Sequence, residues 1–489
     1  MPKLSTSTSR LKNYVGGVWK DSVSEKNGEI YDPGSGRVLG IVPYSTASEV
    51  DEAVAAAQQA FAKWSRLPLP ERVQYLFRLR QMFERHFEDL ARVNTLNHGK
   101  TLEESRGDIK RAIENIEMAI SAAHTLAKGE VLDRVADGID EYMVREPLGV
   151  FAVVSPFNFP IMIPFWFIPY AIVLGNTVVV KPSEITPLPM NYVAELMEQE
   201  VKLPAGVLNI VHGGRETVEE LIKHRDVVGV SFVGSTAAAR NVYRLAGEHG
   251  KRVIAQGGAK NSIVVMPDAN LNYMPSIISS FFGNTGQRCL AGSNLLLVGP
   301  NGERVKKHFV EAASRLRVGH GLEPGTDMGP LVMESARRRV RMYIEKGIDE
   351  GADLILDGRE TTVEKYPYGF YLGPTVFDNV TPDMEIARTE IFGPVASIIE
   401  TTTLDEVIDI INRGTDYGNM ACIYTSSGAI ADRFRKEVNV GNVGVNIGVA
   451  APAAYFPFGG RKSSFYGVLH AQADTINFFT DRKIVIQRW

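Results

Sequence analysis

Cys289 is the residue whose type and setting point most directly to chemistry. It follows Arg288 inside a glycine-rich segment, residues 283–293. The thiolate is the nucleophilic form of cysteine, and a neighbouring cation lowers the pKa of a thiol. A lone cysteine is also a common small apolar core residue, and we interpret Cys422, in the apolar run 420–424, in that way. Because neither cysteine lies in a Cys-x-x-Cys or Cys/His cluster, we expect no metal site and take Cys289 as the candidate nucleophile.

Asn158 lies in a second segment, Ser155-Pro156-Phe157-Asn158, which directly follows an expected strand. An Asn in such a loop often forms only an Asx turn. Beside a nucleophile, its amide N–H₂ group can instead donate to a developing oxyanion. A third segment, residues 232–236, leads from a strand into an expected helix and carries Ser235. Backbone N–H groups at a helix start, together with a hydroxyl, can bind phosphate, although this segment is not a Gly-x-Gly-x-x-Gly motif.

These three segments occur in order with two more, Lys181-Pro182-Ser183-Glu184 and residues 390–394, which begin with Glu390. From about residue 13 to its end, the chain resembles the NAD(P)-dependent aldehyde dehydrogenase superfamily. The resemblance implies an α/β fold with a Rossmann-like cofactor domain, an α/β catalytic domain and a small β oligomerisation element. It also implies a homodimer or homotetramer.

The resemblance assigns a role to each motif. Cys289 matches the nucleophile that attacks the aldehyde carbon, and Asn158, with the backbone N–H of Cys289, matches the oxyanion hole. The residues placed in the cofactor site are Lys181 and Glu184 at the adenosine ribose, Ser235 at the pyrophosphate, Glu390 at the nicotinamide ribose, and Ser155, Phe157 and Gln256. We expect NAD rather than NADP, because the Glu184 carboxylate would accept a hydrogen bond from the ribose 2′-hydroxyl and repel a 2′-phosphate.

Gln256 marks a departure from the superfamily. Most members carry Glu-(Leu/Met)-Gly-Gly-Lys, whose Glu activates the hydrolytic water, whereas residues 255–261 here read Ala-Gln-Gly-Gly-Ala-Lys-Asn. An amide has no useful basicity near neutral pH, so Gln256 cannot act as a general base. Two interpretations are open. In the first, a water or another group releases the acyl group without this Glu, and Gln256 only lines the nicotinamide pocket. In the second, water is not the acyl acceptor.

One branch of the superfamily lacks this Glu, the acylating methylmalonate-semialdehyde dehydrogenases. The chain resembles it at Gly-Ala-Lys-Asn 258–261, at Gly-Gln-Arg-Cys 286–289 and over residues 456–471. The branch oxidises malonate or methylmalonate semialdehyde with NAD, transfers the acyl group to coenzyme A and releases CO₂. Its two carboxylate-binding arginines match Arg288 and Arg111, because the guanidinium fork fits a carboxylate. For Arg111 a solvated helix face is an equally good interpretation, and a hydrolytic aldehyde dehydrogenase of broader substrate range is the alternative function.

The segments that must position these residues alternate between strands and helices. Strands are expected at 149–155, 177–181, 208–211 and 229–233, with helices at about 187–201 and 215–224 between them. This alternation predicts a parallel, doubly wound sheet. Three helices are expected before this alternation: one that begins after Ser48 as N-cap, one at about 70–97 and one at 101–127.

The chain is expected to divide into three parts. An NAD-binding domain covers 1–128 and 148–256, and a catalytic domain covers 257–446. An oligomerisation element consists of the hairpin 129–147 and a strand-forming tail, 472–489, which pair across subunits.

Composition narrows the possible partners and compartment. The 489 residues include 53 Lys and Arg against 57 Asp and Glu, a net charge of −4, so no basic excess indicates nucleic acid or an anionic membrane. The most apolar stretch, 157–180, is interrupted by Pro, Gly and Asn, which argues for a buried segment rather than a membrane span. Two cysteines are too few for a disulfide framework, and the N-terminus lacks the apolar core of a secretory signal. We therefore expect a cytoplasmic protein.

Overall fold

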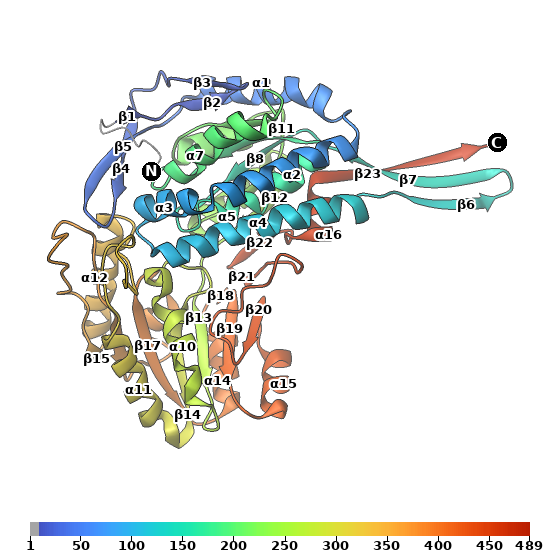
Figure 1. The fold of residues 1–489 in the computed structure, drawn as a ribbon. Helices are drawn as coiled ribbons and strands as arrows, with labels where there is room; N and C mark the ends of the chain where they lie inside the picture. The colour runs from blue at the N-terminus through green and yellow to red at the C-terminus, as the bar shows by residue number, and fades with distance from the viewer. Residues whose placement is uncertain (1–8) are drawn as a thin grey trace.

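Two large β-sheets organise the chain (Figure 1). The computed structural model describes residues 9–489, so the expected start of the first domain at residue 1 lies outside the described residues. The strands of the 8-stranded sheet are, in order across it, β22 (Phe465–Gly467), β12 (Arg252–Gln256), β11 (Val227–Val233), β8 (Val150–Val154), β9 (Thr177–Lys181), β10 (Leu208–Ile210), β2 (Asn13–Val15) and β3 (Val18–Lys20). Strands β12 to β10 run parallel, which confirms the predicted doubly wound sheet.

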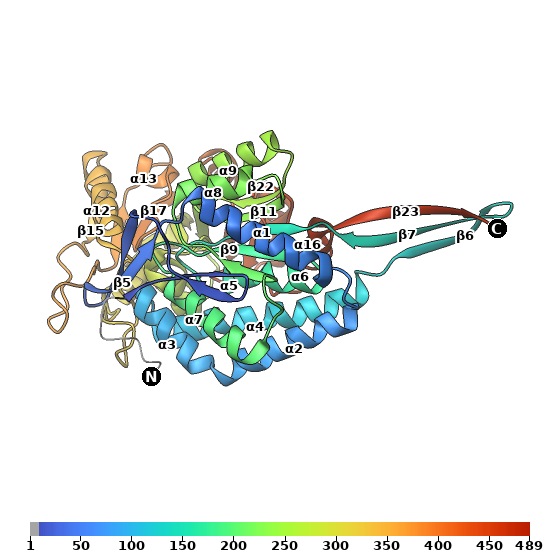
Figure 2. The same ribbon diagram turned by 90° about the horizontal axis from the view of Figure 1, so that it is seen from above.

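Helices cover both faces of this sheet (Figure 2). One face carries α1 (Ala47–Trp64), α8 (Arg215–Lys223) and α9 (Thr236–Glu248). The opposite side carries α2 (Leu69–Arg85), α3 (Phe87–His98), α4 (Leu102–Thr125), α5 (Met162–Phe165), α6 (Ile168–Val173) and α7 (Leu188–Leu196), the last continued by a π-helical turn (Met197–Val201). Along β8, Ala152 packs toward the first group, whereas Phe151 and Val153 pack toward the second. The central strands β8, β9 and β10 are mostly apolar and buried at every position because both faces of the sheet are covered.

Two of the expected helix boundaries are wrong. The N-cap of α1 is Thr46 rather than Ser48, since Thr46 and Glu49 form a reciprocal capping box. The expected helix at 70–97 is two helices, because the backbone leaves helical geometry at His86, with φ −103° and ψ 18°. The expected helix at 101–127 is α4, which begins after the N-cap Thr101.

The second large sheet has 7 strands, all of which lie between residues 261 and 445. In order across the sheet they are β15 (Asp353–Leu356), β16 (Thr375–Asp378), β17 (Val395–Thr401), β14 (Gly292–Val298), β13 (Asn261–Val265), β19 (Met420–Tyr424) and β20 (Asn442–Val445). Its helices are α10 (Met274–Phe282), α11 (Gly302–Ser314), α12 (Glu334–Asp349), α13 (Glu385–Arg388), α14 (Leu404–Arg413) and α15 (Gly428–Glu437). One continuous apolar cluster includes Phe151 of the first sheet and Leu295 of the second, so the two layers share a core.

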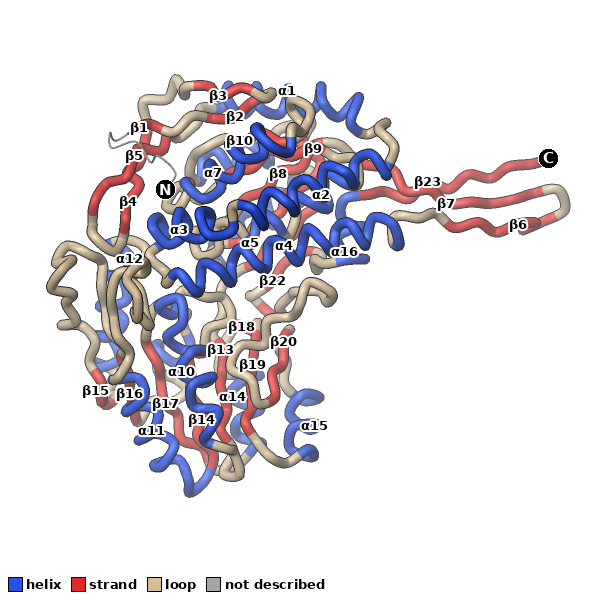
Figure 3. Tube along the Cα trace, in the orientation of Figure 1, coloured by secondary structure: helices blue, strands red, loops and turns tan. Residues whose placement is uncertain are grey.

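A three-stranded arm extends away from the body of the molecule (Figures 1 and 3). It consists of β6 (Glu130–Ala136), β7 (Ile139–Pro147) and β23 (Thr480–Arg488), and β7 pairs with both others within the same chain. The expected strand from residue 472 is wrong over its first part, which forms α16 (Gln472–Phe479). The reason is burial: Phe478 and Phe479 pack against Phe151 in the core instead of alternating along an exposed ribbon.

Small elements complete the chain. A three-stranded sheet near the N-terminus contains β1 (Ser9–Arg10), β5 (Arg37–Pro43) and β4 (Asn27–Asp32), and a two-stranded sheet contains β18 (Tyr417–Gly418) and β21 (Arg461–Lys462). Within residues 9–489, no helix combines the length and apolarity that crossing a membrane requires. The same described residues contain no group of three or more His, Cys, Asp or Glu side chains arranged to hold a metal ion.

Candidate active site

Two cavities meet at Cys289. The larger, about 580 Å³, lies at the carboxyl ends of the parallel strands and brings together most of the residues predicted for the cofactor: Ser155, Phe157, Lys181, Glu184, Ser235 and Glu390, with Asn158 beside Cys289. The smaller, about 270 Å³, has Arg111 and Arg288 in its wall. Cys289 contributes to the lining of both cavities. A ligand in either cavity can therefore reach the thiol.

The loop that carries Cys289 is held by its backbone. Asn284 and Thr285 adopt left-handed conformations, with φ values of 54° and 55°, and reverse the chain between α10 and the thiol. The main-chain oxygen of Cys289 accepts hydrogen bonds from the side-chain amides of Asn261, at 2.9 Å, and Asn419, at 2.8 Å. These two amides fix the peptide that follows the nucleophile.

The thiol of Cys289 is protonated in this setting. Burial, with a smaller contribution from the nearby Glu390 carboxylate, raises the pKa of Cys289 to about 12. The Arg288 guanidinium and the backbone N–H groups of Cys289 and Leu290 lower the pKa, as the sequence predicted for Arg288, but they do not outweigh desolvation. Desolvation therefore outweighs the cation beside the thiol, and the net pKa of Cys289 is raised.

Asn158 lies directly across from the nucleophile loop. Its side-chain amide donates to the main-chain oxygen of Gln287 at 2.9 Å, and the side chain is buried. An amide carries two N–H donors, so one remains for an oxygen in the cavity. The preceding residue is held as well, because Thr186 donates from its hydroxyl to the main-chain oxygen of Phe157 at 3.0 Å. The amide is therefore preorganised.

One end of the larger cavity is built around Lys181, the last residue of β9. Its ammonium donates to the Glu184 carboxylate at 2.9 Å and to the main-chain oxygen of Gly213 at 3.0 Å. Burial acts against ionisation of Glu184, but Lys181 outweighs it, and the pKa of Glu184 is lowered. Nearby, Ser235 caps the start of α9 by accepting a hydrogen bond from the backbone N–H of Ala238 at 3.4 Å. This end combines an ionised carboxylate with the N-terminus of a long helix.

Glu390 provides the carboxylate nearest the thiol side of the larger cavity. It accepts a hydrogen bond from the backbone N–H of Ala259 at 2.8 Å. Gly258 allows the close approach, since a Cβ atom there would lie 2.3 Å from a Glu390 carboxylate oxygen. Burial raises the pKa of Glu390 to about 7, and burial lowers the pKa of the neighbouring Lys260 to about 7. Glu390 therefore exchanges its proton near neutral pH.

Gln256 is set back from both cavities. It is the last residue of β12, lies between Val233 and Phe465 in the sheet, and is only 3% exposed. The described residues that line the two cavities do not include it, and its amide nitrogen is buried without a hydrogen-bond partner among the described residues. Strand β22 covers this edge of the sheet, which explains the burial. A role for Gln256 in binding the cofactor stays a prediction.

The smaller cavity is charged at one end and apolar elsewhere. Arg111, on α4, pairs with Glu114 at 2.7 Å and its side chain is 40% exposed, so it lies on a partly solvated helix face and also borders the cavity. Arg288 pairs with Glu104 at 3.1 Å. The apolar wall includes Phe159, Met162, Trp166, Leu290 and Phe458.

Comparison with known proteins agrees with this geometry. The model of the aldehyde dehydrogenase family matches residues 19–485. The chain belongs to the aldehyde dehydrogenase family. It is 46% identical to malonate-semialdehyde dehydrogenase 2 of Geobacillus kaustophilus, over 99% of this chain and 100% of that protein. It is 43% identical to malonate-semialdehyde dehydrogenase of Halalkalibacterium halodurans, over 98% of both.

Solved structures show the same aldehyde dehydrogenase fold. The methylmalonate-semialdehyde dehydrogenase of Oceanimonas doudoroffii superposes with a TM-score of 0.95 at 37% identity, covering 98% of both chains. An NAD complex from Sinorhizobium meliloti 1021, described as a methylmalonate-semialdehyde dehydrogenase, gives a TM-score of 0.97 at 38% identity and covers 99% of both chains. The predicted family and fold are therefore confirmed.

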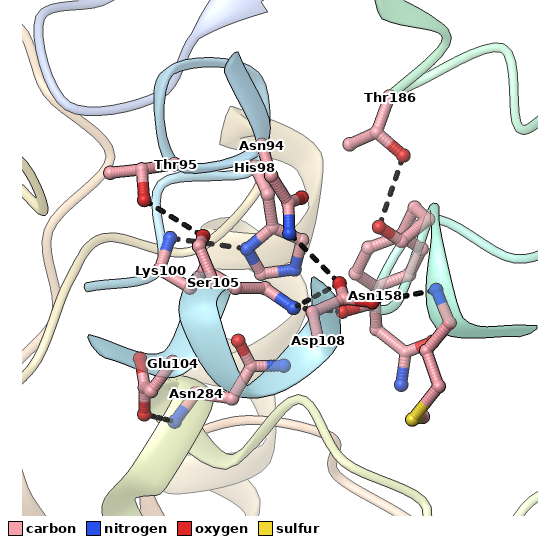
Figure 4. A network of polar contacts seen from close by, with 12 residues as sticks. Asn94, Thr95, His98, Lys100, Glu104, Ser105, Asp108, Asn158, Thr186 and Asn284 are labelled. Atoms are coloured by element: carbon pink, nitrogen blue, oxygen red, sulfur yellow. Dashed lines mark hydrogen bonds and ion pairs between the residues drawn. The ribbon is translucent and has the colours of Figure 1, made fainter. Parts of the chain in front are cut away.

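Sequence reasoning missed a buried polar network behind the active site of this aldehyde dehydrogenase. Figure 4 shows Lys100, Asp108 and Asn158 within it. Lys100 is fully buried, pairs with Asp108 at 3.3 Å and donates to the main-chain oxygen of Asn158 at 2.6 Å. No local motif marks a lysine as buried. Glu104, by contrast, carries a readable signal, since Thr101-x-x-Glu104 has the pattern of a capping box.

Proposed function

We propose that this aldehyde dehydrogenase oxidises malonate or methylmalonate semialdehyde with NAD and transfers the acyl group to coenzyme A, with loss of CO₂. The observation that carries the proposal is the position of Cys289, shared between a large cavity suited to a dinucleotide and a smaller cavity that contains two arginines. For malonate semialdehyde the balance is one semialdehyde anion, NAD⁺ and CoA thiol giving acetyl-CoA, CO₂ and NADH. The curated relatives carry names that agree with this substrate class.

The smaller cavity supplies recognition of the substrate carboxylate. Arg288 and Arg111 would hold it by charge-assisted hydrogen bonds, which are the strong class of protein hydrogen bonds. With the carboxylate held at this end, the aldehyde of a short semialdehyde points to Cys289, which borders the same cavity. An unsubstituted aldehyde lacks the anchoring group and should bind more weakly.

The larger cavity has the groups that NAD requires. Glu184, kept ionised by Lys181, suits a ribose hydroxyl, and the start of α9 at Ser235 suits a pyrophosphate. Glu390, on the thiol side, suits the second ribose. When bound, NAD accepts the hydride that leaves the substrate carbon. The residues of the chain hold the two ribose ends and leave the path to Cys289 open.

The chemistry of the chain starts with the thiolate of Cys289 adding to the aldehyde carbon. The oxygen of the adduct gains negative charge and would be held by the Asn158 amide and the backbone N–H of Cys289. Departure of the hydride leaves a thioester on Cys289. The thiol proton must first leave, and Glu390, with a pKa raised to about 7, is the nearby group suited to accept it.

The acceptor of the acyl group, coenzyme A or water, distinguishes the proposed function from its hydrolytic alternative. Position 256 holds an amide, which cannot deprotonate water, so attack by the thiol of coenzyme A is the favoured release. The position of Glu390 favours the alternative function, a hydrolytic enzyme of broader substrate range. Its carboxylate is ionised above about pH 7 and borders the larger cavity, where it could activate a water.

The test is a turnover assay with and without coenzyme A. Steady NADH formation from malonate semialdehyde should depend on coenzyme A, and the product should be a thioester accompanied by CO₂. Equal turnover without coenzyme A, with a free carboxylic acid as product, would support the hydrolytic enzyme instead. Burst kinetics without coenzyme A should give about one NADH per subunit, because the thioester then waits on Cys289.

We also propose that the arm builds a homodimer or homotetramer. Strand β6 is exposed at every position, and large apolar side chains on the arm face solvent: Val131, Leu132, Ile484, Ile486 and Trp489. Exposed edge strands are prone to pairing with another chain. Light scattering at micromolar concentration should give a multiple of 53.8 kDa, and a monomeric mass would contradict the proposal.

A further inference from the structure

Glu104 is a partly buried carboxylate that joins the start of α4 to the nucleophile loop. One carboxylate oxygen accepts a hydrogen bond from the backbone N–H of Thr101 at 3.0 Å, and the Thr101 hydroxyl accepts from the backbone N–H of Glu104 at 3.3 Å. This capping box holds the carboxylate in one orientation. The second oxygen faces the nucleophile loop, and Glu104 contributes to the lining of the smaller cavity.

That second oxygen receives two donors from the nucleophile loop. The backbone N–H of Asn284, a residue in the left-handed conformation, donates to it, and so does one terminal nitrogen of Arg288 at 3.1 Å. Figure 4 shows Glu104 and Asn284 in contact. Glu104 thereby links a strained turn to the guanidinium that precedes Cys289.

Arg288 is confined from its other side by Gly283. A Cβ atom at Gly283 would lie 2.7–2.8 Å from three guanidinium atoms of Arg288, so the group rests against the glycine backbone. The contact with Glu104 uses one terminal nitrogen, whereas a guanidinium has five N–H donors. Among the described residues the other donors of Arg288 have no hydrogen-bond acceptor, so they can meet a second carboxylate in the cavity.

We propose that Glu104 is a positioning residue that sets the Arg288 guanidinium for the carboxylate of the substrate. The inference rests on the proposed role of Arg288. It makes Glu104 a determinant of selectivity for anionic over neutral substrates, without contact between Glu104 and the reacting atoms. Replacing the carboxylate by an amide leaves three converging N–H donors with one acceptor oxygen, so the guanidinium loses its orientation.

Alkylation of Cys289 by two matched reagents tests this role. Iodoacetate and iodoacetamide both form an S–C bond to the thiolate and release iodide, but only iodoacetate carries a carboxylate. Glu104→Gln should slow iodoacetate about tenfold while iodoacetamide stays within about twofold, because a tenfold change corresponds to one modest charge-assisted contact. Gly283→Ala should also lower the ratio of the iodoacetate rate to the iodoacetamide rate. The φ of Gly283, −58°, accepts alanine, and the new Cβ atom displaces the Arg288 guanidinium.

The control is Glu103→Gln, on the same helical turn. Glu103 is 84% exposed and pairs with Arg106, so both alkylation rates should stay at the wild-type values. Equal slowing of both reagents by Glu104→Gln would show a merely structural role, and an unchanged ratio in Glu104→Gln and Gly283→Ala would also overturn the proposal. The assay needs no cofactor or turnover, so failure to oxidise malonate semialdehyde would overturn the proposed function separately.

Discussion

The ammonium of Lys100 lies 2.6 Å from the main-chain oxygen of Asn158, the residue whose amide faces the nucleophile loop. The partner of Lys100, Asp108, accepts a hydrogen bond from the backbone N–H of Met162 at 2.6 Å. One buried ion pair therefore holds both ends of the segment 158–162. The carboxylate comes from α4 and the lysine from the turn before it, so the oxyanion amide is oriented by helices rather than by its own loop.

Lys100→Met should destabilise the protein and misplace Asn158. Removing one member of a buried ion pair costs about 3–5 kcal/mol, because the other charge is left without compensation. We expect urea denaturation to show a loss of this size and kcat to fall more than KM changes. Lys110→Met, at an exposed position on α4, should leave both the stability and kcat unchanged. Full stability in Lys100→Met would mean that Asp108 finds another partner or a proton.

Alkylation of Cys289 should respond steeply to pH in the enzyme without cofactor. With a thiol pKa of about 12, the thiolate fraction and the iodoacetamide rate should rise about tenfold per pH unit between about pH 7 and 10. Glu390→Gln removes a negative charge that raises this pKa, so it should speed alkylation at a given pH. The Cys289→Ala variant measures the background from Cys422. A plateau below pH 9 in the wild type would contradict the raised pKa.

Gln256→Glu should raise hydrolysis that is independent of coenzyme A, while turnover with coenzyme A falls or holds. A carboxylate at this position can take a proton from water, which the amide cannot. Since position 256 is buried, the new carboxyl should have a raised pKa, and hydrolysis should grow as pH rises through it. Gln256→Leu removes the amide without supplying a base and should show no gain. Unchanged hydrolysis in Gln256→Glu would indicate that water is excluded or misaligned.

Glu184→Gln should narrow the preference for NAD over NADP. The carboxylate, held by Lys181, repels a 2′-phosphate, and an amide removes that repulsion while keeping an acceptor. The measurement is the ratio of kcat/KM for the two cofactors. Glu216→Gln, an exposed residue that pairs with Lys26, is the matched control and should leave the ratio unchanged. A ratio that does not move in Glu184→Gln would remove Glu184 from the ribose site.

The sequence by itself was sufficient to predict those strands and site residues that a short local motif marks. The strand at 150–154 is an unbroken apolar run and the strand at 177–181 has an apolar centre, 178–180, and such runs indicate a sheet buried on both faces. Cys289 and Asn158 stand in segments of distinctive composition, and the structure brings them to one place. The absence of a carboxylate at 256 is visible in the sequence alone. Each of these features depends on residue type and on neighbours within a few positions.

Burial and long-range contacts were decided only by the tertiary structure. Arg288 adjoins Cys289 in sequence, yet desolvation raises the thiol pKa because the fold encloses the nucleophile loop. Residues 472–479 form a helix because their aromatic side chains find a place in the core. Lys100 and Asp108 are eight positions apart, and their shared burial depends on the packing of several helices and the loop at 158. Desolvation and charge pairing depend on which residues are neighbours in space. A short stretch of sequence does not specify those neighbours.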